Sequence, residues 1–258
     1  MIRVGISEAS ARTVRDPREG ARWMVERAAA ARRAGLDSLF VGDHHATPGP
    51  YYQNVPITAR MLAEWGDAPA GCLFLLPLWN PVLVAEQVGT LAAIAGGRFI
   101  LQAGLGDDET QFAAMGTTLR TRVSAFEQSL DAVRRLLAGE VVSASGRFAF
   151  REARVALRPA EPVEVWIGAS APPAIDRAAR LGVGFLAAPG GTPAQARAKV
   201  THYLERCAAH GRTPSAVAVR RDVYVAESRA DIVRHVTDDQ PRVLASLARL
   251  AEVRKALA

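Results

Sequence analysis

Three polar side chains that can exchange protons, Asp43, His44 and His45, follow directly on the apolar segment Ser38–Gly42. Because histidine titrates near neutral pH, it can shuttle a proton or donate a hydrogen bond to the edge of a bound ring. A structural interpretation also fits, in which Asp43 caps a turn and one histidine is a buried hydrogen-bond donor. The segment alone leaves both interpretations open.

A second motif places two glycines, Gly104 and Gly106, before the three carboxylates of residues 107–109. This GxG fragment lacks the third glycine of a dinucleotide-binding loop. The carboxylates also stand where a pyrophosphate would have to dock on a helix N-terminus, and like charges would repel it. We therefore expect the glycines to let a flat ligand approach the backbone closely, and the acidic residues to cap the next helix.

Two loops of small residues each precede a proline and a helical segment, without carboxylates. Such loops offer backbone N–H groups and a hydroxyl to a phosphate, although ordinary turns between a strand and a helix have the same composition. The candidate anion-binding residues in these loops are Gly168, Ala169, Ser170, Ala188, Gly190 and Gly191.

The elements that position these residues alternate between short apolar runs and helical segments, a pattern typical of parallel strands with crossover helices. Sequential units of this kind favour a TIM (β/α)8-type barrel, in which the chemistry lies at the C-terminal ends of the strands. We expect a single domain over residues 1–258, with an inserted hairpin at about 140–157 and a helical end at about 229–258 that provides no eighth strand. The expected strands are Ile2–Ile6, Ser38–Gly42, Gly71–Leu76, Arg98–Ala103, Val163–Ile167, Val183–Ala187 and a segment within Val217–Ala226.

The composition argues against several classes of protein. The net charge is +6, but the 32 basic residues, of which only Lys199 and Lys255 are lysines, are dispersed without a run of four, so we expect no nucleic-acid partner. No apolar run reaches the roughly 18–20 residues that span a bilayer, and the N-terminus lacks a signal-peptide pattern, so we expect a cytoplasmic protein that does not enter membranes. The cysteine and histidine spacings predict no metal site. A basic surface still suits an anionic small molecule.

Taken in order, these segments closely resemble the bacterial luciferase-like monooxygenase family over about residues 1–227. A strand and helix, a Gly-Gly-Arg turn, the GxG fragment and the late small-residue loop all match, together with Asp43-His44-His45, which is intermediate between the Glu-His-His of luciferases and the Asp-His of deazaflavin enzymes. The matching segments are Gly71–Pro81, Ala85–Leu91, Gly96–Phe99, Gly104–Gly106, Arg122, Glu127, Val165–Ser170 and Gly182–Phe185.

The resemblance implies a barrel that binds reduced FMN or coenzyme F420, a deazaflavin, with the ring at the mouth of the barrel. It places the ring near Cys72, Leu73 and Phe74, where family members often have a cis peptide bond. It carries the phosphate contacts over to Gly168, Ala169 and Ser170, and makes His44 the catalytic residue beside the cofactor-binding Asp43. Cys72 stands where Thr or Ser is common, which removes one hydrogen bond to the ring.

The implied activity is two-electron oxidation or reduction of a small organic substrate under the loop His44–Val55, where Tyr51 and Tyr52 either line the pocket or pack the loop. FMN would support monooxygenation and the deazaflavin would support hydride transfer; the arginine-rich composition favours the deazaflavin by association. The alternatives are a non-catalytic flavin-binding or storage protein and an inactive subunit of a heterodimer. The resemblance also implies a homodimer, and a barrel shortened at its C-terminal end.

Overall fold

Seven strands form a sheet in which every neighbouring pair runs parallel. The structure, a computed structural model, describes residues 2–11, 13–14, 16–226 and 239–257. The strands lie in the order β1-β2-β3-β4-β7-β8-β9. Their bounds are Ile6–Glu8 (β1), Leu39–Val41 (β2), Ala70–Leu75 (β3), Phe99–Gly104 (β4), Glu164–Ala169 (β7), Gly184–Ala187 (β8) and Val217–Val219 (β9).

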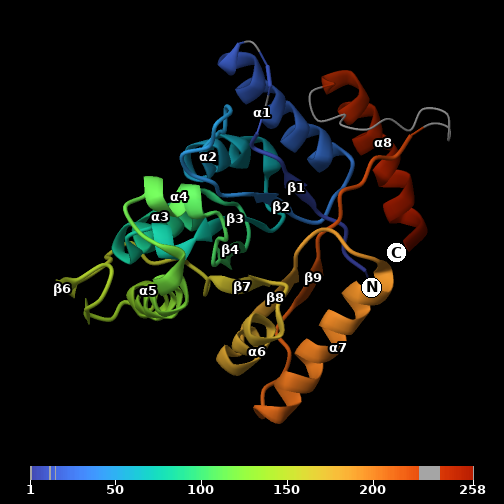
Figure 1. Cartoon of the computed structure of the whole chain (residues 1–258). Coiled ribbons are helices and arrows are strands. Elements are labelled where there is room, and N and C mark those ends of the chain that lie inside the picture. Colours follow the sequence, from blue (N-terminus) through green and yellow to red (C-terminus); the bar gives the residue numbers. More distant parts are fainter. Residues whose placement is uncertain (1, 12, 15, 227–238, 258) are drawn as a thin grey trace.

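Helices alternate with these strands and lie around the sheet (Figure 1). Asp16 and Asn80 cap two of them by accepting hydrogen bonds from Arg18 N and Val82 N, each at 2.9 Å, and a proline follows each cap with its φ already suited to a helix. The bounds are Pro17–Arg33 (α1), Asn54–Trp65 (α2), Pro81–Ile94 (α3), Glu109–Ala114 (α4), Arg122–Leu137 (α5), Pro172–Leu181 (α6), Pro193–Ala209 (α7) and Gln240–Leu257 (α8).

A contact between aromatic rings shows that the sheet curls into a barrel. Phe40 of β2 and Trp166 of β7 have ring centroids 5.2 Å apart, although β3 and β4 lie between their strands. In a flat sheet the strands of these two residues would be about 14 Å apart, because neighbouring strands are spaced by about 4.8 Å. The rings therefore meet across the interior of a curved sheet, as an α/β barrel requires.

Six of the seven expected strands lie within one or two residues of their predicted bounds, but the first was placed wrongly. The first strand was predicted at Ile2–Ile6, whereas β1 spans Ile6–Glu8. Val4 does not join the sheet, because its N–H donates to the side chain of Asp37 and its carbonyl accepts from Asp37 N, both at 2.8 Å. Ile2 is 64% exposed, so the apolar pattern there does not mark a buried strand.

The predicted inserted hairpin at residues 140–157 is present as an antiparallel pair, Val142–Ala144 (β5) and Phe150–Ala153 (β6). Arg147 at its tip fastens the hairpin to the barrel. The guanidinium donates to Pro77 O at 2.8 Å and to Met115 O at 2.9 Å, on the loops that follow β3 and α4. The hairpin is therefore held against the same end of the barrel as the candidate site.

Strands β1 and β9 are the edge strands of the sheet, and within the described ranges they do not pair with each other and no eighth strand joins this sheet. Helix α8 lies beside α1 at this open side (Figure 1). Arg254 donates to the carboxylate of Asp37 at 2.7 Å, and Ser246 Oγ accepts from Val225 N at 2.8 Å, so α8 contacts the chain on both sides of the gap. Residues Gln240–Leu257 of the expected helical end form α8, whereas residues 227–238 lie outside the described part.

A buried ion pair joins β1 to α1 and connects both to α8. Arg27 Nη1 lies 3.1 Å from Glu8 Oε1, and their side chains are 2% and 5% exposed. Arg27 Nε donates to Gln240 Oε1 at 2.6 Å. A buried pair of this kind holds three elements in register, and removal of one partner deprives the other buried charge of this contact.

We predict that Arg27→Met lowers the free energy of unfolding by about 3–5 kcal/mol, because the buried carboxylate of Glu8 then loses its ion pair with Arg27. The double variant Arg27→Met, Glu8→Leu should recover most of this loss, since no isolated charge remains. Urea denaturation of the three proteins measures the differences. A single variant within about 1 kcal/mol of the wild type would contradict this account of the pair.

Candidate active site

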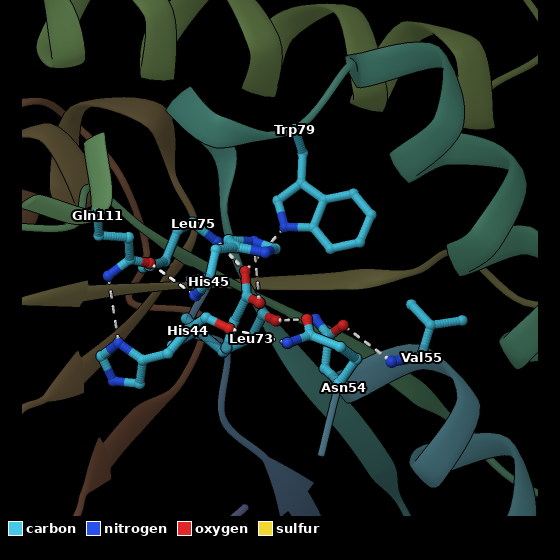
Figure 2. Close-up of polar contacts among 10 residues, drawn as sticks. His44, His45, Asn54, Val55, Leu73, Leu75, Trp79 and Gln111 are labelled. Carbon is cyan, nitrogen blue, oxygen red and sulfur yellow. Dashed lines mark hydrogen bonds and ion pairs between the residues drawn. The ribbon is translucent and has the colours of Figure 1, made fainter. Parts of the chain in front are cut away.

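The segment Asp43-His44-His45 leaves the C-terminal end of β2 and meets residues that follow β3 and β4 (Figure 2). Leu75 and Trp79 come from the end of β3 and the turn after it, and Gln111 comes from α4. Parallel strands bring these segments together because all their carboxyl ends lie at one edge of the sheet. The predicted location of the chemistry is therefore the place where the polar side chains gather.

Asp43 is completely buried and organises this end of the barrel. Its Oδ2 accepts hydrogen bonds from Leu75 N and from Trp79 Nε1, both at 2.8 Å. Its Oδ1 has no hydrogen bond in the described structure, but lies 3.3 Å from Nε2 of His45. The carboxylate therefore positions neighbouring groups. Direct contact between Asp43 and a coenzyme stays a prediction, because the side chain is fully buried in the structure.

The two histidines lie in different environments. The His44 ring is exposed and meets the edge of the Tyr51 ring, with centroids 5.5 Å apart. The His45 side chain is 11% exposed, and its ring centroid lies 5.2 Å from that of Trp79. Of the two rings, His44 is the one that a ligand can reach, and His45 fits the structural interpretation of a histidine that is mostly buried beside a carboxylate.

Two buried amides support this segment, and the sequence analysis missed both. Gln111 accepts from His45 N at 2.9 Å and approaches His44 Nδ1 at 3.4 Å, and Asn54 donates to Leu73 O at 2.6 Å. Gln111 occupies the third position of α4, after its cap Asp108, where a glutamine usually belongs to a capping box. The sequence pattern therefore gave it a local explanation and no signal for its tertiary contacts.

The loop His44–Val55 is attached on both sides. Tyr52 donates from its hydroxyl to Pro17 O, and Gln53 Nε2 donates to His44 O at 3.1 Å. Of the two interpretations of the tyrosines, Tyr52 packs the loop against α1, while Tyr51 contacts the candidate catalytic ring. Burial, together with the charge of Asp43, raises the pKa of Tyr51 to about 12, so its phenol stays protonated at neutral pH.

Strand β3 presents only part of the predicted ring-binding segment to the barrel interior. The thiol of Cys72 lies beside Thr58 of α2, and burial raises its pKa, so it is a protonated core side chain. Phe74, two residues on, points to the same outer side and is fully buried, which leaves Leu73 on the inner side. The Cys72 thiol therefore packs in the core, and its effect on hydrogen bonding to a ring stays a prediction. The peptide bonds of the described residues are all trans.

The glycines of the GxG fragment are explained by packing within the protein. A Cβ on Gly104 would lie 3.0 Å from Leu75 and 3.3 Å from Leu73, and Gly106 has a φ of +72° beside Phe112. Asp108 accepts from Gln111 N at 3.1 Å, so the predicted capping of the next helix is confirmed. Contact of Gly104 and Gly106 with a flat ligand stays a prediction, because the leucines near Gly104 and the positive φ of Gly106 already favour glycine at both positions.

The two small-residue loops lie side by side, because β7 and β8 pair through Ala169 and Ala187. The loop Ala188–Gly191 leads into α7, whose first N–H groups are occupied: Thr192 and Gln195 form a reciprocal capping box. At α6, by contrast, no side chain forms a cap in the described structure, and Ser170 is exposed. The exposed Ser170 hydroxyl is therefore near a helix start without a side-chain cap, and anion binding at either loop stays a prediction.

Among the described residues, no cluster of three or more His, Cys, Asp and Glu side chains has the geometry to hold a metal ion. In the same part of the chain, no helix is both long enough and apolar enough to cross a bilayer.

A curled parallel sheet with polar residues gathered at its strand ends defines an α/β-barrel protein, and comparison with known sequences identifies the family. The family described as luciferase-like monooxygenase matches residues 2–256. The chain belongs to this family. The resemblance and the fold class predicted from the sequence are therefore confirmed.

Individual relatives are more distant. The F420-dependent glucose-6-phosphate dehydrogenase of Intrasporangium calvum is 30% identical over 183 residues, which are 66% of this chain and 55% of the relative. The 4-hydroxyprotoasukamycin monooxygenase of Streptomyces nodosus subsp. asukaensis is 27% identical over 234 residues, which are 79% of this chain and 59% of the relative. The chain thus spans somewhat more than half the length of these curated relatives.

Solved structures show the same fold. The monooxygenase RslO1 from Streptomyces bottropensis superposes with a TM-score of 0.80 at 20% identity, covering 98% of this chain and 80% of that protein. The oxygenating constituent of 3,6-diketocamphane monooxygenase from Pseudomonas putida, solved with FMN, gives a TM-score of 0.77 at 17% identity, covering 87% and 68% of the two chains.

We predict that Trp79→Phe lowers the free energy of unfolding by about 1.5–3 kcal/mol, because it removes one of the donors that neutralise a buried carboxylate. The control is the same substitution in an Asp43→Asn background, where the acceptor is neutral and the cost should shrink. Thermal or urea unfolding of the four proteins gives the coupling energy directly. Equal costs in both backgrounds would mean that the indole and the carboxylate do not interact as described.

Proposed function

We propose that the chain is an oxidoreductase that uses a flavin-type coenzyme, F420 or FMN, to oxidise or reduce a small organic substrate. The observation that carries the proposal is the exposed His44 ring at the same sheet edge as Gly168–Ser170, where β7 ends and the exposed Ser170 follows. A titratable group and an anion-suited loop are the two elements that a phosphate-bearing redox coenzyme requires. The activities named for the matched relatives support this proposal.

The residues at this edge fit such a coenzyme. Gly168, Ala169 and the exposed hydroxyl of Ser170 would hold its phosphate, and the backbone of β3 around Leu73, fastened by Asn54, would lie against its ring. Two prolines open α6 and have no N–H, so the Ser170 hydroxyl gains importance as a donor. The second loop, with Ala188, Gly190 and Gly191, would form the neighbouring wall.

The chain's own contribution is orientation and proton handling. When bound, the coenzyme supplies two-electron transfer, by hydride for F420 or with molecular oxygen for FMN. Asp43 holds the turn after β3 in place, and Gln111 holds the backbone of His45. His44 Nε2 is then available to a ligand. It can exchange a proton, or form a hydrogen bond, with an oxygen or nitrogen atom of that ligand.

We propose F420 as the first coenzyme to test, because the relative with 30% identity carries that coenzyme in its name. The net charge of +6 also suits the polyglutamate tail of F420. FMN is the second candidate, since a structure solved with FMN shares the fold. A flavin-storage role would be supported by tight binding without turnover of any substrate.

We further propose that the chain acts in the cytoplasm as a homodimer. Of the α3 residues considered for a dimer face, Val84, Val88 and Leu91 are buried in the core, as the core interpretation predicted. Leu83 and Ile94 on the same helix are each 49% exposed and are the better candidates for such a face. Sedimentation velocity of the purified chain decides the oligomeric state.

We predict that apo protein binds F420 or FMN and that Ser170→Asp weakens this binding at least about 100-fold. Two negative charges about 4 Å apart near a protein surface repel each other by about 4 kcal/mol, and every 1.4 kcal/mol is a factor of ten. Fluorescence titration with each coenzyme separately measures the affinity.

The matched control is Ser215→Asp, which adds the same charge to an exposed loop before β9, at the opposite end of the sheet. It should bind as the wild type does. Tight binding of neither coenzyme by the wild type would overturn the proposed function, and equal affinity of the Ser170 variant would remove that loop from the site.

We predict that His44→Ala leaves coenzyme affinity within about threefold and lowers kcat by about 100- to 10,000-fold, the usual contribution of a general acid or base. Coenzyme absorbance would be followed with alcohols, sugar phosphates and carbonyl compounds as substrates. His202→Ala, at a half-buried position of α7 that follows β8, is the control and should keep full activity. Wild-type turnover by the His44 variant would exclude the ring from the reaction.

A further inference from the structure

The side-chain amide of Gln111 lies between the two histidines that follow β2 (Figure 2). Its Oε1 is 2.9 Å from His45 N, and its Nε2 is 3.4 Å from His44 Nδ1. The first contact determines which end of the amide is which. A backbone N–H can only donate, so the atom facing His45 N must be the oxygen, and the NH2 group must face His44.

This orientation has a consequence for the proton on His44. An amide NH2 group has hydrogens to donate and accepts no hydrogen bond, so Nδ1 of His44 must be the acceptor and must be without a proton. In a neutral imidazole the single proton is then on Nε2. We propose that Gln111 is a positioning residue that holds His44 in the Nε2–H tautomer and thereby makes it a hydrogen-bond donor at the mouth of the barrel.

Gln111 cannot reverse its amide without setting its NH2 group against the His45 N–H, so that two donors would face each other. It is 4% exposed, its backbone N–H donates to the cap Asp108, and the neighbouring Phe112 is fully buried. No charged group in the described contacts competes with Gln111 for His44 Nδ1. The nearby carboxylate of Asp43 directs its Oδ2 to Leu75 and Trp79 and its Oδ1 toward His45. The tautomer is thus set by one neutral amide whose own position is set by burial.

The consequence for ligands rests on the proposed function. A ring with Nε2–H presents a donor, so it suits an oxygen that accepts hydrogen bonds, such as a carbonyl or an oxyanion of the substrate or coenzyme. The neighbouring Tyr51 phenol stays protonated at neutral pH and is a second neutral group beside the ring. This edge of the site therefore recognises acceptor oxygens without placing a fixed charge next to them.

The test is the tautomer itself, measured in protein without coenzyme. Two-bond 1H–15N correlation spectra of 15N-labelled protein at about pH 8, where imidazole is neutral, distinguish protonated from unprotonated ring nitrogens. The spectrum of His44→Ala assigns the His44 signals. We expect Nε2–H in the wild type, and signals that show Nδ1–H would overturn the proposal.

Gln111→Glu is the decisive variant, because it keeps the length of the side chain and replaces the NH2 group by a second acceptor oxygen. One carboxylate oxygen can still accept from His45 N, and the other requires a proton on His44 Nδ1. We expect the His44 tautomer to switch to Nδ1–H. An unchanged Nε2–H pattern in this variant would show that Gln111 does not select the tautomer.

Gln111→Leu is the matched control, because it removes both polar atoms and should give a mixture of the two tautomers. The indole N–H resonance of Trp79, assigned from Trp79→Phe, reports whether the contacts of Asp43 survive in each variant.

If turnover is found, Gln111→Glu should lower kcat about 10- to 100-fold with coenzyme affinity unchanged, as expected for loss of an orienting group. The spectra need no activity, so failure of the proposed function would leave this inference open to its own test.

Discussion

A carboxylate can be buried only where donors replace its water, because an unpaired buried charge costs several kcal/mol. Asp43 is completely buried, and its donors come from the end of β3 and from the turn before α3. These hydrogen bonds hold the segment after β2 at a fixed distance from the segment after β3. The same carboxylate lies beside His45, whose backbone N–H orients Gln111. The exposed ring of His44 is therefore positioned through a chain of contacts that begins at a residue which no ligand needs to touch.

The sequence was sufficient for the parts of this arrangement that depend on local patterns. Apolar runs, proline caps and the order of segments led to the barrel and to all of its strands except the first, where Val4 pairs with a side chain instead of the sheet. The prediction that the chemistry gathers after β2, β4 and β7 follows from topology alone. Gln111 and Asn54 were not found, because each has an ordinary explanation at its position near the start of a helix, and its tertiary partners are distant in the sequence. The side to which Cys72 points also depended on the register of β3, which a continuous apolar run does not reveal.

The open side of the sheet is stabilised differently from the rest of the barrel. Elsewhere neighbouring strands share backbone hydrogen bonds, whereas α8 is joined to its surroundings through side chains, with Arg27, Gln240, Asp37 and Arg254 forming the polar contacts. Such contacts depend on geometry and on charge. The bond from Arg254 lowers the pKa of Asp37, so its contribution to stability is full above about pH 4 and is lost as the pH falls through the lower folded-state value. Acid is for this reason expected to weaken the attachment of α8.

The loop after β2 is anchored at Tyr52 on α1, at Gln53 on the His44 carbonyl, and by a bridge between Ala11 and Tyr51. Ordering a residue's backbone costs roughly 1–2 kcal/mol in conformational entropy, and here the cost is met when the protein folds. A ligand that reaches His44 meets a surface already in its final shape. If a ligand binds there as proposed, its association would need little reorganisation of the chain, and this edge would select by rejecting ligands that do not fit a rigid arrangement of donors.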